Sequence, residues 1–187
     1  MSGAAEVWLG LGKADGQVEV TVRDNGWAVS PDDAYAMLRG LRTLEARITR
    51  QGAAGLEIAT WLGDQPEVAR VLHPALPNFP DHALFKRDFA GPNGLFSVVL
   101  RAAPDPAVLA MLNALELFGL GFSWGGFESL AIHCGPQLKT ARTAEPWRAE
   151  GPVVRFHVGL EDPADLIADL EIGLAAWRAA LKASLQA

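Results

Sequence analysis

The sequence predicts an α/β or α+β sandwich, in which helices cover a small β-sheet. Half of its 187 residues are hydrophobic, which suffices for one good-sized core or two small ones. Apolar patterns with helical spacing alternate along the chain with short apolar runs that are typical of strands. Three of the helical patterns begin with an oxygen-bearing side chain that suits a helix cap, followed by a proline: Ser30-Pro31, Asp105-Pro106 and Asp162-Pro163.

The N-terminal residues, 1–29, follow a different pattern from the main predicted domain, residues 30–187. Apolar side chains alternate at positions 7–11 and again at positions 18–22. Between these two runs, the sequence Lys13-Ala14-Asp15-Gly16 is typical of a turn. Two alternating runs joined by a turn predict a β-hairpin in this atypical N-terminal segment.

Three helices are expected in the residues that follow. The first is a long helix over about 31–62, because apolar residues between Met37 and Ile48 recur at helical spacing. Gly52 and Gly55 weaken its middle, each by roughly 1 kcal/mol relative to alanine. The other two helices are expected over about 106–117 and 163–181.

The predicted strands lie between these helices. Each is a short run rich in branched or aromatic apolar residues, which fit a half-buried pleated surface. The expected strands span residues 68–72, 95–100, 118–122 and 153–158. Residues 135–152 are polar and contain prolines, so an irregular excursion over the surface is expected there.

Composition argues against several classes of function. The 16 basic and 22 acidic residues give a net charge of −6, so no nucleic-acid partner is expected. No apolar run is long enough to span a bilayer and no signal-peptide pattern is visible, so no membrane association is expected. The single cysteine, Cys134, excludes an intrachain disulfide, and a cytoplasmic protein is expected. The four scattered histidines lack metal-ligand spacing, so no metal site is expected.

The motif Phe122-Ser123-Trp124-Gly125-Gly126 follows an apolar run that is predicted to be a strand. With Gly121 it reads G-x-S-x-G, but two glycines begin a helix poorly, so a hydrolase nucleophile elbow is disfavoured. A serine, an indole and two glycines at a strand end suit the rim of a ligand pocket. The alternative is a tight turn with a packed tryptophan, which composition alone favours because glycines are common in turns.

The predicted strand 153–158 contains an arginine among apolar residues. Alternation places Arg155 and His157 on one face and the neighbouring apolar residues on the other. A guanidinium in such a strand needs a partner, and its planar fork suits a carboxylate. The carboxylate belongs either to a ligand or to an Asp or Glu of the chain. The pattern alone favours the internal salt bridge.

Four stretches carry a family resemblance, and they cover about residues 26–177. They are the segment 30–44, VARVLHPALPNFPDHALFKRDFAGPNGLFS at 68–97, FSWGGFESL at 122–130 and VVRFHVGLEDPADLIADL at 153–170. In this order and spacing the sequence resembles the C-terminal part of the transsulfuration, or Cys/Met metabolism, family of pyridoxal-phosphate enzymes. The resemblance is strongest to the cystathionine β-lyase branch of that family.

The resemblance implies a fold and a set of binding residues. Residues 30–187 would adopt the C-terminal domain of fold-type-I pyridoxal-phosphate enzymes, a small and mostly antiparallel sheet covered by helices, with a long N-terminal helix. Arg155 would bind the α-carboxylate of the substrate, and Ser123 and Trp124 would border the substrate. With the resemblance, a ligand is favoured over an internal salt bridge as the partner of Arg155.

The family's cofactor, pyridoxal phosphate, forms a Schiff base with a lysine in a Ser-x-Thr-Lys-Tyr-type segment. The four lysines of this chain lack that context: Lys13, Lys86, Lys139 and Lys182. No catalytic or cofactor-binding residue is therefore assigned. Pyridoxal phosphate is expected in the full-length family and is not expected to bind to this chain alone.

The function expected from the resemblance is that of the substrate-carboxylate-recognising domain of a carbon–sulfur lyase. In the complete enzyme it would bind a cystathionine-like amino acid, and by itself it is expected to be inactive. The alternative is a non-enzymatic remnant or assembly module that self-associates or pairs with a pyridoxal-phosphate-binding partner. In both cases a homo-oligomer or a partner subunit is expected.

Overall fold

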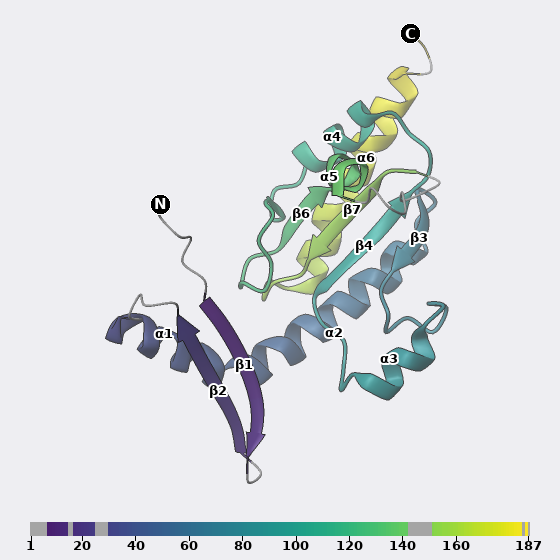
Figure 1. Ribbon diagram of the computed structural model, residues 1–187. Helices are drawn as coiled ribbons and strands as arrows, with labels where there is room; N and C mark the ends of the chain where they lie inside the picture. Colours follow the sequence, from purple (N-terminus) through teal and green to yellow (C-terminus); the bar gives the residue numbers. More distant parts are fainter. Residues whose placement is uncertain (1–6, 15–16, 25–29, 142–150, 185, 187) are drawn as a thin grey trace. The chain divides into compact units, whose positions relative to one another are not determined.

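The structure, a computed structural model, describes residues 7–14, 17–24, 30–141, 151–184 and 186 (Figure 1). Contacts within the chain divide it into two compact units, residues 1–45 and residues 46–187. Across the described ranges, no helix combines the length and the apolar character that a bilayer crossing requires.

The first unit contains an antiparallel pair of strands. β1 (Val7–Ala14) pairs with β2 (Gln17–Asp24) along the whole length of both strands. In this register, residue 9 is opposite residue 22 and residue 11 is opposite residue 20. The two alternating apolar runs of the sequence therefore lie opposite each other in the pair.

The single helix predicted over 31–62 is divided into two helices. α1 (Pro31–Arg42) ends at Thr43, and α2 (Leu44–Gly63) begins directly after it. The amide of Thr43 donates to the Gly40 carbonyl at 3.2 Å, and the Thr43 hydroxyl lies 3.3 Å from the same oxygen. A threonine side chain that bonds to nearby carbonyls competes with the regular helical pattern, which accounts for the interruption.

The second unit is built on a five-stranded sheet with the strand order β3-β4-β7-β6-β5 (Figure 1). Neighbouring strands are antiparallel, except β5 and β6, which are parallel. The predicted small and mostly antiparallel sheet is therefore confirmed. The strands are β3 (Val68–Leu72), β4 (Leu95–Leu100), β5 (Gly119–Leu120), β6 (Leu130–His133) and β7 (Val153–His157).

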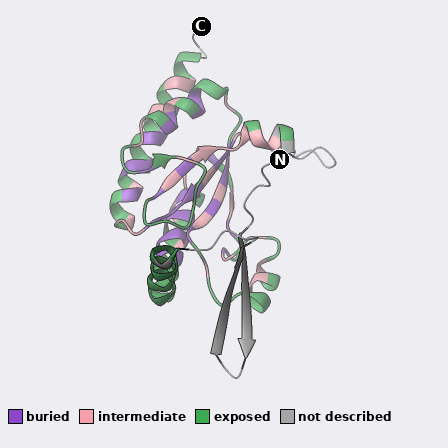
Figure 2. Ribbon diagram, turned by 60° about the vertical axis from the view of Figure 1, so that its left-hand side comes forward, coloured by how far each residue is buried: buried purple, intermediate pink, exposed green. Residues whose placement is uncertain are grey.

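The core of this unit lies between the sheet and three helices, α2, α4 (Asp105–Asn113) and α6 (Pro163–Ser184). Alternate residues of the central strands, such as Val98 and Phe156, are completely buried against these helices (Figure 2). Burying a side chain of this size stabilises the fold by about 2 kcal/mol. Because the helices cover one face of the sheet, only the opposite face is available for a binding site.

Two elements are shorter than the sequence pattern predicts. α4 ends at Asn113 instead of 117, and β5 covers only residues 119–120 instead of 118–122. Between them, the buried carboxylate of Asp169 accepts hydrogen bonds of 2.7–3.0 Å from the amides of residues 116–118. These amides cannot also join a helix or a strand ladder, so both elements stop here.

Three short elements are not predicted from the sequence: β6, α3 (His82–Asp88) and α5 (Gly135–Ala141). α3 buries none of its residues, so no apolar stripe marks it in the sequence. α5 occupies the start of the predicted surface excursion, 135–152, of which residues 142–150 lie outside the described ranges.

Candidate functional site

β7 presents two polar side chains on the face of the sheet that the core helices leave uncovered. Val154 and Phe156 are completely buried in the core, as the alternation predicts, so Arg155 and His157 lie on the opposite face. His157 is only 3% exposed, whereas Arg155 is partly exposed. A shielded imidazole therefore lies two positions from an accessible guanidinium.

The guanidinium of Arg155 contacts the turn that follows β5. Its Nη2 donates a hydrogen bond of 2.6 Å to the carbonyl oxygen of Phe122. Within the described ranges, the ion pairs are Arg87–Asp88 and Arg178–Glu67, so the internal salt bridge that the pattern favoured is not found there. A guanidinium has five N–H donors, and a single carbonyl leaves most of them for a further acceptor.

The turn itself, residues 122–126, exposes large side chains. Phe122 is 70% exposed and Trp124 is 62% exposed, so the indole is not packed into the core. Gly125 has a φ of +88°, in the region that residues with a side chain rarely adopt. The glycine therefore allows the chain to reverse at this point, and the tryptophan and Ser123 remain at the surface.

Two side chains from other elements hold the second half of the turn. The amide of Gly125 donates to Nε2 of His157 at 3.1 Å. The carbonyl of Gly126 accepts a hydrogen bond of 2.6 Å from Nε2 of Gln51, which lies on α2 and is 75 residues away in the sequence. The alternation in β7 marks His157 in the sequence, but no sequence pattern marks Gln51.

The segment after the turn is fixed by a carboxylate. Glu161 accepts hydrogen bonds of 2.8 Å from both the amide and the hydroxyl of Ser129. The same hydroxyl oxygen accepts a hydrogen bond of 2.9 Å from the Gly159 amide. Bonds to a charged acceptor are the stronger class, so the segment between the turn and β6 has a defined path.

Cys134 lies just beyond the end of β6, beside the Arg155 strand. Its amide donates to the Val153 carbonyl at 2.8 Å. Burial raises the pKa of the Cys134 thiol, and the charge of Arg155 acts in the opposite direction. The thiol therefore stays protonated at neutral pH, and we assign it no role as a nucleophile.

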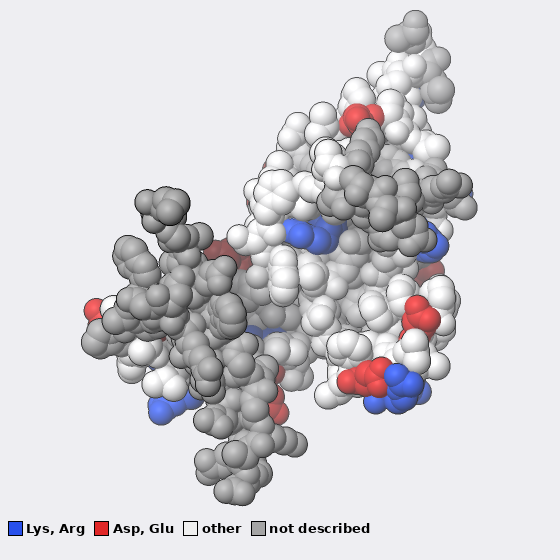
Figure 3. Space-filling model, viewed as in Figure 1, with Lys and Arg blue, Asp and Glu red and all other residues white. Residues whose placement is uncertain are grey.

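Charged side chains are scattered over the face that Figure 3 shows. The described basic side chains there stand singly or next to acidic ones. Arg87 and Asp88 form such a pair at 2.7 Å, with both side chains largely exposed. Exposed pairs of this kind contribute little energy.

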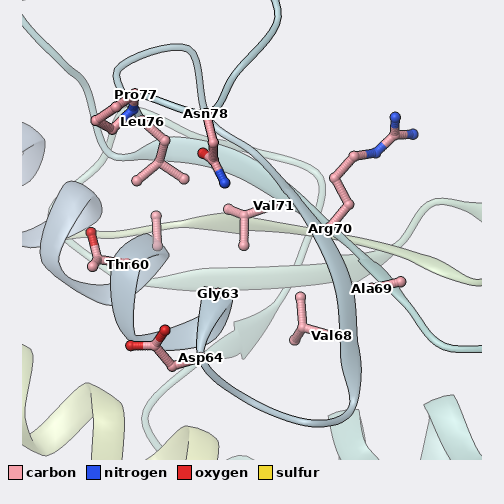
Figure 4. Close-up of a pocket in the computed structure, with 11 residues that line it drawn as sticks. Thr60, Gly63, Asp64, Val68, Ala69, Arg70, Val71, Leu76, Pro77 and Asn78 are labelled. Atoms are coloured by element: carbon pink, nitrogen blue, oxygen red, sulfur yellow. The ribbon is translucent and has the colours of Figure 1, made fainter.

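A separate cavity of about 370 Å³ lies between the end of α2, β3 and residues 76–78 (Figure 4). In Figure 4 the side chain of Arg70 points away from the other residues of the lining, which include Asp64 and Asn78. Neither Arg155 nor any residue of the 122–126 turn lines this cavity. The candidate site is therefore at β7 and the turn, and not in this cavity.

The described residues do not fit the cofactor that the resemblance implies. The lysines whose side chains are described, Lys86 on α3 and Lys182 on α6, are exposed and do not line the cavity of Figure 4. Pyridoxal phosphate needs a lysine held in a pocket. In addition, the described part of the chain contains no group of three His, Cys, Asp or Glu residues that could hold a metal ion.

Comparison with known proteins identifies relatives over most of the chain. The family model described as Cys/Met metabolism PLP-dependent enzyme matches residues 4–175, and this match includes most of the N-terminal segment. A cystathionine beta-lyase of Bordetella avium is 48% identical over 145 residues, which is 78% of this chain and 36% of that protein. A cystathionine beta-lyase of Salmonella typhimurium is 43% identical over 179 residues, which is 92% of this chain and 45% of that protein.

A solved structure shares the fold. The crystal structure of metB from Corynebacterium glutamicum matches with a TM-score of 0.70 and 34% sequence identity. The match covers 80% of this chain and 39% of that chain. This chain thus spans less than half the length of the relatives it matches.

Proposed function

Because this chain belongs to the Cys/Met metabolism PLP-dependent enzyme family, we propose that it is the substrate-carboxylate-recognising, C-terminal part of a cystathionine β-lyase-like carbon–sulfur lyase. Two relatives named cystathionine beta-lyase, at 48% and 43% identity, support this assignment. In the complete enzyme, the site on β7 would hold a cystathionine-like amino acid.

The proposal rests on the hydrogen bonding and the partial exposure of the Arg155 guanidinium. One of its nitrogens is fixed by the Phe122 carbonyl, while the side chain stays partly exposed. Fixing one corner of the fork reduces the rotamer freedom that binding would otherwise remove. The remaining N–H groups suit two oxygens of a carboxylate, which is the geometry of amino-acid recognition.

The turn supplies the other contacts of the proposed site. Ser123 offers a hydroxyl that can donate or accept a hydrogen bond, and the exposed indole of Trp124 offers an apolar wall. These groups bind and orient an amino acid. Because the described residues do not fit pyridoxal phosphate, we assign them no step in bond cleavage.

The test is the binding of L-cystathionine to the purified chain, measured by NMR titration. The Arg155→Ala variant is expected to bind at least about tenfold more weakly, because a hydrogen-bonded charged group is lost. Arg155→Lys should fall between the two, since an ammonium lacks the planar fork. Arg70→Ala, which removes an exposed arginine from edge strand β3, is the matched control and should bind like the unaltered chain.

Equal affinities for the unaltered chain and Arg155→Ala would contradict the carboxylate role. The far-UV circular dichroism of each variant serves as the folding control. If Arg155→Ala and the control Arg70→Ala lose affinity equally, the ligand is held by general positive charge and not by Arg155.

A second candidate function, an assembly module, is favoured by exposed apolar residues in the first unit. Tyr35, Leu38, Leu41 and Leu44 recur at intervals of three residues along α1 and the start of α2, and they are between 37% and 64% exposed. Such a row at helical spacing is typical of a helix that packs against a partner. We propose a second copy of this chain, or a pyridoxal-phosphate-binding subunit, as that partner.

Light scattering on a gel-filtration column tests the assembly proposal. The unaltered chain is expected to elute as a dimer or larger species at micromolar concentration. The double variant Leu38→Glu/Leu41→Glu should shift it to the monomer, because two buried charges would oppose association. A monomeric mass for the unaltered chain at all concentrations would contradict self-association.

A further inference from the structure

His157 lies beneath the turn that carries Ser123 and Trp124. Its imidazole is 3% exposed, and Nε2 is 3.1 Å from the amide nitrogen of Gly125. The same Nε2 is 3.4 Å from the carbonyl oxygen of Gly126, while Nδ1 has no partner among the described residues.

Arg155 and His157 therefore act on the two halves of one turn. Arg155 holds the carbonyl of Phe122 at 2.6 Å, and His157 holds the amide of Gly125 at 3.1 Å. The two residues between these anchors are Ser123 and Trp124. Both anchors come from β7, whose pairing with β4 and β6 fixes the spacing of their side chains.

We infer that His157 is a positioning residue for the substrate-carboxylate site: its Nε2 holds the Gly125 amide and thereby keeps Ser123 and Trp124 beside Arg155. The value of this positioning to the ligand rests on the proposed function of Arg155, whereas the hydrogen bond itself does not. An N–H group donates only to an unprotonated ring nitrogen, so the bond from the Gly125 amide uses the tautomer that carries its proton on Nδ1.

The geometry predicts how substitutions at this position differ. Glutamine places its amide oxygen close to the position of Nε2, so His157→Gln retains an acceptor for the Gly125 amide. Asparagine is shorter and reaches only the position of Nδ1. Leucine fills a similar volume without an acceptor. His157→Asn and His157→Leu therefore both leave the Gly125 amide without an acceptor, whereas His157→Gln does not.

The test follows the Gly125 amide directly. A chain labelled with ¹³C-carbonyl tryptophan and ¹⁵N-glycine gives a single Trp-Gly signal, because this dipeptide occurs once in the sequence, at Trp124-Gly125. Hydrogen exchange of that amide is expected to be about tenfold faster in His157→Leu and His157→Asn, since an unpaired donor is exposed to solvent more often. In His157→Gln it should stay within about threefold of the unaltered chain.

L-cystathionine titration provides the second readout. We expect affinity to fall about tenfold in His157→Leu and His157→Asn and to recover in His157→Gln. His133→Gln, at a partly exposed histidine of the neighbouring strand β6, is the matched control and should change neither measurement.

Three outcomes would overturn the inference. The first is an unchanged exchange rate of the Gly125 amide in His157→Leu. The second is a His157→Gln variant that behaves like the leucine variant in a folded chain. The third is equal cystathionine affinity in all variants. If cystathionine does not bind the unaltered chain, the proposed function fails, and the exchange rate alone decides whether His157 holds the turn.

Discussion

Arg155 and His157 stand two positions apart on β7, and each bonds to the backbone of the same turn. Bonds of this kind contribute about 0.5–3 kcal/mol each, and the larger values apply when a charge is involved. Removal of either side chain also leaves a backbone group without its partner. At the scale of single residues, the order of the site therefore depends on a few side-chain-to-backbone bonds.

His73 shows how burial changes the behaviour of a single residue. It is 2% exposed and packs against Phe96 with ring centroids 5.6 Å apart. Its Nδ1 accepts a hydrogen bond of 3.1 Å from the Ala75 amide, while Nε2 has no partner among the described residues. Burial lowers the pKa of His73, because an imidazolium cation is poorly solvated in the core.

A pH-dependent loss of stability follows from this lowered pKa. As pH falls below about 6.5, the unfolded chain binds a proton at His73 more readily than the folded chain does. The free energy of unfolding is therefore unaffected by His73 above about pH 7 and decreases as the pH falls toward about 5. His73→Asn keeps an acceptor for the Ala75 amide but does not titrate, so its urea unfolding should depend less on pH in this range. A pH dependence as steep as that of the unaltered chain would contradict the assignment.

At the scale of elements, the helix starts agree with their sequence signals to different degrees. The Ser30 hydroxyl accepts from the Asp33 amide at 3.1 Å, and Asp162 accepts from the Ala164 amide at 2.9 Å. Asp105, in contrast, lies inside the first turn of α4 and makes no cap bond. A capping residue before proline locates a helix start to within about one residue, and tertiary packing decides the rest.

Gly52 and Gly55 have a different role from the one their helix propensity suggests. Both are buried on α2, and a Cβ at Gly52 would collide with the carbonyl oxygen of Pro92. A Cβ at Gly55 would lie 2.9 Å from the carbonyl oxygen of Asn93. The glycines therefore allow the loop before β4 to approach the helix.

Gly52→Ala is expected to lower the free energy of unfolding by about 1–2 kcal/mol. The strain of overpacking, about 1–3 kcal/mol or more against fixed backbone, outweighs a gain of about 1 kcal/mol in helix propensity. Gly63→Ala on the same helix is the control, because its Cβ would meet only Val71 at an ordinary 3.8 Å. Urea unfolding of the two variants would measure the difference. Equal stability of both would show that the loop moves away without cost.

At the scale of the whole molecule, the chain spans less than half the length of the relatives it matches. Its described lysines do not form a cofactor pocket, and none of its four lysines lies in a Ser-x-Thr-Lys-Tyr-type segment. In the proposed function, the residues that the structure brings together at β7 would bind and position a ligand. The proposed division of labour is thus between this chain and a part of the enzyme that holds the cofactor.

Incubation of the 187-residue chain with pyridoxal phosphate, followed by borohydride, tests that division. We expect no stoichiometric adduct at a single lysine, because the described lysines, Lys86 and Lys182, are exposed and none of the four lysines lies in a Ser-x-Thr-Lys-Tyr-type segment. Peptide mass spectrometry locates any adduct, and lysozyme treated in the same way gives the background level of labelling. A one-to-one adduct at one lysine, together with pyruvate release from cystathionine, would show that this chain is active alone.

The class of the fold and the position of its strongest elements follow from the amino-acid pattern and the family resemblance. β3 and β4 have the predicted bounds, because each is a short run rich in branched or aromatic apolar residues, which fit a pleated and half-buried surface. β6 was missed, since a four-residue strand after a glycine-rich turn has too short a pattern. Alternation also placed Arg155 and His157 on the face away from the core.

The contacts of those two side chains depend on how distant segments of the chain pack together. The carbonyl of Phe122 and the amide of Gly125 are backbone groups that every residue other than proline has, so no sequence pattern distinguishes them. The contact of Gln51 with Gly126 joins two residues that are 75 positions apart in the sequence. The sequence thus shows which side chains a segment has, while the groups that these side chains contact depend on packing between distant segments.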